Sequence, residues 1–187
     1  MAIKIYIDQG HNPVNPNAGA EGNGYREQDI VYDIGIRLSA ILRSYGFETR
    51  LSRPTPEAIL GTSNSSSLRA RVNDANSWGA DYFISLHTNA SEITTASGSE
   101  AFVYRLGSDA AVLADHILRQ LNFATGLPDR GVFARPSLYV VRKTAMPALL
   151  LELGFISNPY DASLMANNPT LFAQGIANGF LEFFGML

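Results

Sequence analysis

The chain has 187 residues and no cysteine, which excludes disulfides, thiolate metal sites and cysteine nucleophiles. Its net charge of −3 argues against a nucleic-acid partner, because proteins that bind nucleic acid usually carry a strongly basic surface. A content of 46% hydrophobic and 17% charged residues is typical of a globular protein. No apolar stretch approaches the ~20 residues of a membrane helix, and no signal-peptide pattern opens the sequence, so we expect no membrane insertion.

The first part of the chain predicts a strand, a loop, a helix and a second strand. Isoleucines alternate with other residues over 3–7, as in a half-buried strand. Residues 12–24 are rich in Asn, Pro and Gly and predict a loop. Apolar residues then recur at helical spacing over 30–45, where Gly46 can end the helix, and 47–51 predicts a strand.

The rest of the chain continues to alternate between helices and strands. We expect a polar loop at 52–66, a helix at 67–78 capped by Ser67, strands at 82–86 and 100–104, a helix at 109–121, strands at 138–141 and 148–151, and a helix at 169–184. Such alternation is typical of α/β proteins with a parallel sheet. The predicted fold is one three-layer α/β domain over residues 1–187, a mostly parallel twisted sheet of about six strands with helices on both faces.

Three chemically active side chains follow predicted strands. His11, His87 and Glu152 each come just after a short apolar run, and parallel strands place the residues that follow them on one shared rim. Glu27, at the start of a predicted helix, can complete the group. Two imidazoles and one carboxylate form a three-ligand Zn²⁺ site with an open fourth position, and this leaves a second carboxylate for acid/base chemistry.

Each of these residues also has an ordinary interpretation. A single histidine in a globular protein is often a surface or satisfied core residue. Glu27 can be a first-turn acid that complements the helix dipole. Glu152 is harder to explain in this way, because it interrupts an apolar run where an ionised carboxylate is costly unless paired or functional. His116 lies within a helical pattern and is expected to be an exposed helix residue.

Residues beside the predicted ligands have two interpretations each. Asp8 can orient an imidazole from behind, as metal-bound histidines generally require, or it can cap the loop. Asn89 and Ser85 flank His87 and can contact substrate or hold the turn. For the three arginines of this region we expect structural ion pairs: Arg53, Arg69 and Arg71.

Five segments, in chain order, closely resemble the zinc-dependent N-acetylmuramoyl-L-alanine amidases of the amidase-3 type. They are residues 8–11 (Asp-Gln-Gly-His), 24–27 (Gly-Tyr-Arg-Glu), 67–73, 85–89 and 147–158, with Asp-Arg-Gly at 129–131 between the last two. The resemblance covers nearly the whole chain. One departure is Gln9, where the family usually has proline, and this loop change affects no ligand.

The resemblance implies a role for each residue and a substrate. His11, Glu27 and His87 would bind one Zn²⁺, and Glu152 would be the catalytic carboxylate. The bond cut would be the amide between the lactyl group of N-acetylmuramic acid and L-alanine in peptidoglycan. We therefore expect a protein that acts at the cell wall, as a secreted autolysin or a phage lysin, and that is a monomer.

Two other functions remain open at this point. The same ligands suit a zinc carboxypeptidase-like hydrolase of peptide stems, which would differ in its products. A non-catalytic module that binds cell wall is the other alternative. The presence of all four predicted active-site residues argues against it.

Overall fold

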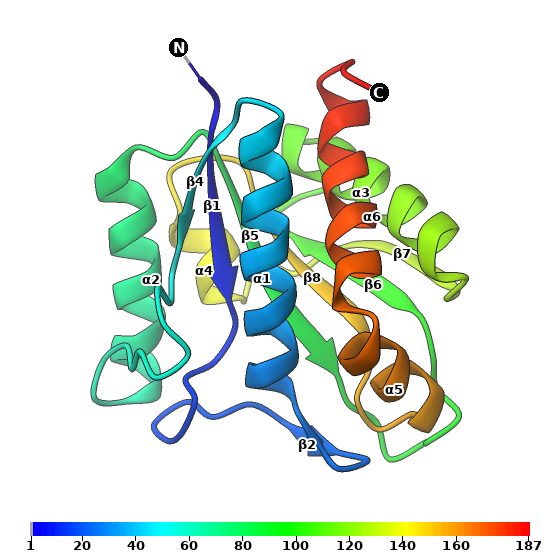
Figure 1. Cartoon of the computed structure of the whole chain (residues 1–187). Coiled ribbons are helices and arrows are strands. Elements are labelled where there is room, and N and C mark those ends of the chain that lie inside the picture. Colours follow the sequence, from blue (N-terminus) through cyan, green and yellow to red (C-terminus); the bar gives the residue numbers. More distant parts are fainter. Residues whose placement is uncertain (1) are drawn as a thin grey trace.

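The computed structural model describes residues 2–187 and contains a six-stranded sheet with strand order β4-β1-β5-β8-β6-β7 (Figure 1). The strands are β1 (Lys4–Gln9), β4 (Glu48–Leu51), β5 (Tyr82–Asn89), β6 (Ser99–Val103), β7 (Asp129–Ala134) and β8 (Ala148–Phe155). Neighbouring strands are parallel except for the antiparallel pair β6 and β8. The predicted mostly parallel sheet is therefore confirmed.

Helices cover both faces of this sheet. They are α1 (Glu27–Ser44), α2 (Asn64–Trp78), α3 (Asp109–Thr125), α4 (Tyr139–Lys143), α5 (Pro159–Asn167) and α6 (Pro169–Phe183). Helices α1, α3 and α6 form one layer, whereas α2 and α4 lie on the opposite face (Figure 1). A short hairpin of β2 (Glu21–Gly22) and β3 (Tyr25–Arg26) leads into α1.

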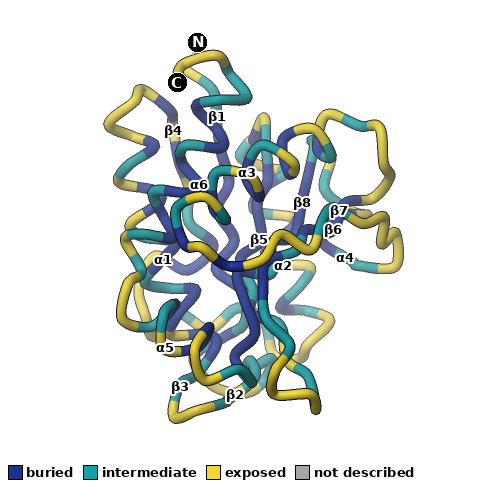
Figure 2. The backbone as a smooth tube through the Cα atoms, turned by 90° about the vertical axis from the view of Figure 1, so that its right-hand side faces the viewer, coloured by how far each residue is buried: buried dark blue, intermediate teal, exposed yellow. Residues whose placement is uncertain are grey.

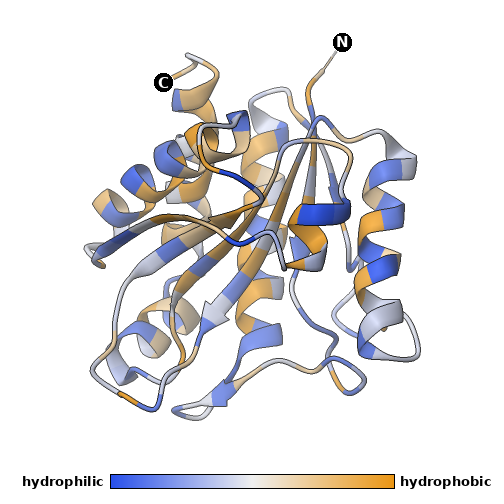
Figure 3. Cartoon of the chain, turned by 180° about the vertical axis from the view of Figure 1, so that it is seen from behind, coloured by the Kyte–Doolittle hydropathy of each residue, from blue (hydrophilic) through white to orange (hydrophobic). Residues whose placement is uncertain are grey.

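The central strands are buried on both faces. Figure 2 shows them as a dark buried centre, with exposed segments confined mainly to loops and outer helix turns. Figure 3 shows the same strands as hydrophobic over most of their length. Two separate apolar clusters result, a large one beneath α1, α3 and α6 and a smaller one beneath α2 and α4. Because both faces of the sheet are buried, these strands consist of nearly continuous apolar runs in the sequence.

Helix ends show which local signals were decisive. Gly46 has φ +89° and donates its N–H to the carbonyl of Arg43, so it ends α1 as predicted. Helix α2, however, begins before the predicted Ser67. Ser63 is its N-cap and exchanges hydrogen bonds with Ser66, while Ser67 is buried inside the helix. Several serines in this run could cap the helix, and the predicted cap, Ser67, was wrong.

The predicted strand at 138–141 is also wrong, because this segment forms α4. Val140 and Val141 favour strands by propensity, but here both are buried in the cluster that α4 makes with β8 and α2. The sixth strand is instead β7, at the edge of the sheet. Helix α5 was not predicted either, although Asn158 caps it and Pro159 opens it, a recognisable start signal.

Helices α3 and α6 pack closely through glycine, which predicts a stability effect. A Cβ at Gly179 would lie 2.4 Å from the Cα of Ile117, a backbone atom that cannot move away cheaply. We expect Gly179→Ala to lower the free energy of unfolding by about 1–2 kcal/mol, since overpacking outweighs the better helix propensity of alanine. Urea unfolding measures this. Asn178→Ala, at a half-buried position of the same turn where only a hydrogen bond from Gln174 is lost, is the control and should change stability less.

Candidate active site

Two parallel strands and one helix start bring the predicted ligands together. His11 follows β1 and His87 lies near the end of β5, which pairs with β1. Glu27 is the first residue of α1, which begins at the end of the sheet toward which β1 and β5 point (Figure 1). Ligand atoms of the three side chains lie within 4.8 Å of one another. The structure thus assembles the group that the sequence predicted.

Glu27 is the centre of this group. One carboxylate oxygen lies 3.3 Å from Nε2 of His11, and the other lies 3.1 Å from Nδ1 of His87. The same oxygens accept hydrogen bonds from the backbone N–H groups of Ala20 and Thr88. Burial by itself would raise the pKa of Glu27, but hydrogen bonds and charge from both histidines outweigh it and hold the pKa well below its usual value.

These three residues fit a divalent ion such as Zn²⁺. An ionised carboxylate between two imidazoles is the donor set of catalytic zinc sites. Nδ1 of His11 is buried and has no hydrogen-bond partner within residues 2–187, so the ring carries unused binding capacity. The donor set and this unpartnered nitrogen both favour a metal centre over a purely structural cluster.

The loop that carries His11 adopts a strained conformation. His11 has φ +65°, a left-handed conformation that costs a non-glycine residue about 1–2 kcal/mol. The side chains of Arg71 and Arg53 both donate hydrogen bonds to the His11 carbonyl, at 2.6 and 3.2 Å. A Cβ at Gly10 would lie 2.6 Å from a ring atom of His87, so only glycine allows this close approach. The hydrogen bonds from Arg71 and Arg53 therefore hold His11, the first predicted ligand, in place.

Arg71 forms a buried ion pair with Asp8. Its guanidinium donates to the Asp8 carboxylate at 2.6 Å, and the other Asp8 oxygen accepts a hydrogen bond from Ser85 at 2.7 Å. Arg71 also donates to the carbonyls of Gln9 and His11. Asp8 contacts neither imidazole, but it supports His11 through Arg71.

The other two arginines of this region differ from each other. Arg53 is 1% exposed, and no carboxylate of residues 2–187 pairs with it; it donates instead to the carbonyls of Gln28 and His11. Arg69 is exposed. The predicted structural ion pair is thus found for Arg71, whereas Arg53 satisfies backbone carbonyls behind the site.

Glu152, on β8, lies beside the candidate metal-binding group of His11, Glu27 and His87. It is the register neighbour of His87 on β5, and on the other side it is paired with Glu100 of β6. One of its carboxylate oxygens is buried and has no hydrogen-bond partner within the described residues. Burial above all raises the pKa of Glu152 to about 7. Such a carboxyl can both accept and donate a proton near neutral pH.

Next to Glu152 is a polar network that was not predicted from the sequence. Asn89 donates to Glu100 at 2.6 Å, and Arg130 donates to the other oxygen of Glu100 at 3.2 Å. Asn89 therefore positions Glu100, which lies opposite Glu152 in the sheet. Arg130 belongs to the Asp-Arg-Gly segment at 129–131. This motif was the sequence feature that pointed to the network.

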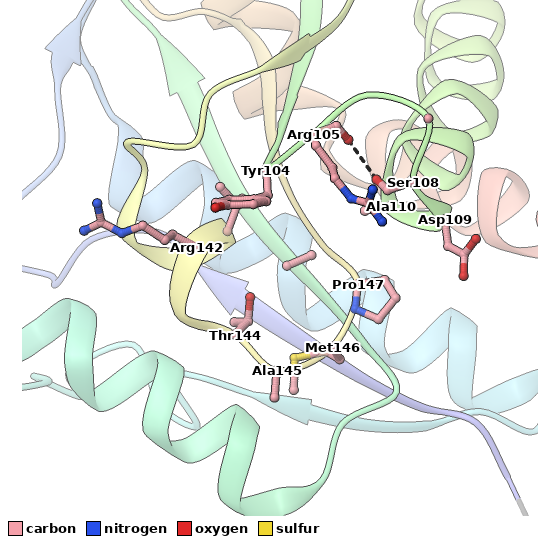
Figure 4. A pocket seen from close by; sticks show the side chains of 13 residues that line it. Tyr104, Arg105, Ser108, Asp109, Ala110, Arg142, Thr144, Ala145, Met146 and Pro147 are labelled. Atoms are coloured by element: carbon pink, nitrogen blue, oxygen red, sulfur yellow. Dashed lines mark hydrogen bonds between the residues drawn. The ribbon is translucent and has the colours of Figure 1, made fainter.

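Two cavities show where ligands can enter. One of about 150 Å³ adjoins His11 and His87 and is mostly apolar, with Leu68, Leu138 and Leu150 in its wall. Another, of about 450 Å³, lies at the opposite end of β8, between Tyr104, Arg142 and Pro147 (Figure 4). His11 and His87 line the first cavity and no histidine lines the second, so we place the chemistry at the first. His116 lines neither cavity; it is half-buried on α3 beside Glu182.

Comparison with known proteins agrees with this geometry. Residues 5–182 match the model of the N-acetylmuramoyl-L-alanine amidase family. The chain belongs to this family. The sporulation-specific N-acetylmuramoyl-L-alanine amidase of Bacillus subtilis (strain 168) is 34% identical over 98% of this chain and 69% of its own length. The endolysin of Bacillus phage SPP1 is 33% identical over 97% of the chain and 66% of its own length.

A solved structure of similar fold supports the assignment. The catalytic domain of CwlV, an N-acetylmuramoyl-L-alanine amidase from Bacillus (Paenibacillus) polymyxa var. colistinus, superposes with a TM-score of 0.85 at 29% identity. The match covers 99% of both chains. The predicted family and enzyme class, an amide hydrolase, are therefore confirmed. Among residues 2–187, no helix has the length and apolar character needed to cross a membrane.

Proposed function

We propose that this amidase hydrolyses the amide between N-acetylmuramic acid and L-alanine in peptidoglycan and depends on one Zn²⁺. The observation that carries the proposal is the His11, Glu27 and His87 group with the Glu152 carboxylate beside it, one oxygen of which is buried and unpartnered. Names of the relatives support the choice of substrate. We assign residues 1–187 as the catalytic domain, acting as a monomer at the cell wall.

The residues divide the chemistry between them. His11, Glu27 and His87 would hold the Zn²⁺, which when bound supplies a Lewis acid and lowers the pKa of water to about 7. Glu152 takes a proton from the attacking water as general base and later delivers it to the nitrogen of the departing amine. A carboxyl with a pKa of about 7 suits both steps, because each protonation state is accessible at neutral pH.

The topology suits a polymeric substrate. The polar segments at 12–24, 52–66 and 90–98 follow β1, β4 and β5, three strands that are parallel to one another. All three segments therefore start at the rim that carries the ligands. We infer that they border an open groove for a glycan strand with its peptide stem.

Metal removal and product analysis test this function. Purified protein should contain about one zinc per chain, lose cleavage of a defined muropeptide on chelation, and recover it with added Zn²⁺. Glu27→Gln should abolish zinc retention. Glu21→Gln, an exposed acid in the hairpin before α1, is the matched control and should keep it.

Product identity separates the alternatives. The proposed amidase frees the amino group of L-alanine and leaves the lactyl carboxyl on muramic acid. Release of a single carboxy-terminal amino acid would instead identify a carboxypeptidase. Binding of cell wall without any cleavage by the zinc-loaded protein would identify a non-catalytic module.

A further inference from the structure

A strip of the sheet beside Glu152 is open on the face of the site. Glu100, Phe102 and Phe133 lie on this face, because Glu100 pairs with Glu152, and Phe102 pairs with Leu150 on one side and Phe133 on the other. Arg135 follows β7 and lies over the Phe102 ring. We call these four residues the β6–β7 strip. Phe133 is 46% exposed and Arg135 is exposed, whereas Phe102 is buried beneath Arg135, so a ligand can reach the strip at Arg135 and Phe133.

Arg135 is a cation without an acidic partner. Its guanidinium carbon lies 4.3 Å from the centre of the Phe102 ring, and no carboxylate of residues 2–187 lies within 4.0 Å of it. Arg130 provides the contrast, since it is neutralised by Glu100 and lies over Phe155. Stacking on an aromatic ring orients a guanidinium while leaving its N–H groups free for an anion.

Arg135 also lies close to the reacting carboxyl. Phe102 is two residues from Glu100 on the same strand and face, a spacing of about 7 Å. Glu100 is in turn directly opposite Glu152. The Arg135 guanidinium is therefore roughly two strand residues, about 7 Å, from the Glu100–Glu152 pair, within reach of the second residue of an extended peptide stem.

The charge of the substrate identifies the group that fits. In the proposed substrate the lactyl carboxyl is already used in the scissile amide, and the N-acetylated sugars are neutral. Free carboxylates remain on the peptide stem, whose second residue carries one unless it is amidated. Guanidinium groups bind carboxylates in a bidentate manner, and a carboxamide cannot replace this charge.

We propose that Arg135 binds a carboxylate of the peptide stem, and that the enzyme consequently favours stems whose second residue is a free acid over stems in which it is amidated. This inference rests on the proposed function. Arg135 acts here as a specificity-determining residue.

Paired substrates test it. Zinc-loaded enzyme is given two muropeptides with the same tripeptide stem, one with a free α-carboxylate at the second residue and one with the α-carboxamide. We expect kcat/KM to be about tenfold higher for the acid, from one charge-assisted contact. In Arg135→Gln the acid should lose this advantage, so that the two substrates are cleaved equally. Arg142→Gln, an exposed arginine on α4, is the control and should keep the preference.

The possible outcomes are distinct. Equal kcat/KM values for both substrates in the wild type would overturn the inference but leave the proposed function intact. An equal loss on both substrates in Arg135→Gln would also overturn it, because Arg135 would then act only through Glu152. Cleavage of neither substrate by the wild type would refute the proposed function itself.

Discussion

Glu152→Ala is expected to lower kcat by about 10²–10⁴-fold, the usual contribution of general acid/base catalysis. Zinc content should stay near one per chain, because Glu152 is not part of the ligand group. The physical reason is that a single carboxyl handles the proton in both steps, and no other carboxylate oxygen of residues 2–187 is buried without a hydrogen-bond partner. Metal analysis and steady-state kinetics on a defined muropeptide measure the two quantities.

Stability distinguishes a catalytic role from a structural one. One oxygen of the Glu152 carboxylate is buried and lacks a hydrogen-bond partner, which costs free energy in the folded state. Glu152→Gln keeps the shape of the side chain and removes its charge, so it should be equally inactive and at least as stable in urea unfolding. Full activity in either variant would refute the assigned role.

Arg71→Met is expected to lower the free energy of unfolding by about 3–5 kcal/mol, because it leaves a buried charge on Asp8 without compensation. Arg71 and Asp8 are each 1% exposed and lie 2.6 Å apart. The substitution also removes a hydrogen bond to the carbonyl of His11, whose left-handed conformation needs support. We therefore expect zinc affinity to fall together with stability.

Matched variants separate these effects. Arg69→Met changes an exposed arginine on the same helix and should alter stability by no more than about 0.5 kcal/mol. Asp8→Asn combined with Arg71→Met removes both charges and should recover part of the lost stability, as measured in a double-mutant cycle. If Arg69→Met and Arg71→Met were equally stable, the ion pair would contribute nothing to the fold.

Several features followed from local sequence patterns. The apolar runs of β1, β5 and β8 and the helical spacing of α1 and α6 are strong periodic signals, and they placed most of the sheet and its helices correctly. His11, His87 and Glu152 were found because each stands at or near the end of such a run. The secondary-structure predictions failed for two short segments, α4 and β7. Secondary-structure propensity is weak there, and burial against β8 or β6 decides whether the segment forms a helix or a strand.

The sequence by itself determined the fold class and pointed to the four candidate site residues, because hydrophobic periodicity and residue type are local properties. Only the tertiary structure decided how these residues work. The antiparallel pairing of β6 with β8 puts Glu100 opposite Glu152, and the folded loops put Arg53 and Arg71 against the carbonyl of His11. These contacts join residues more than 40 positions apart, and no local pattern encodes which distant donor meets which acceptor.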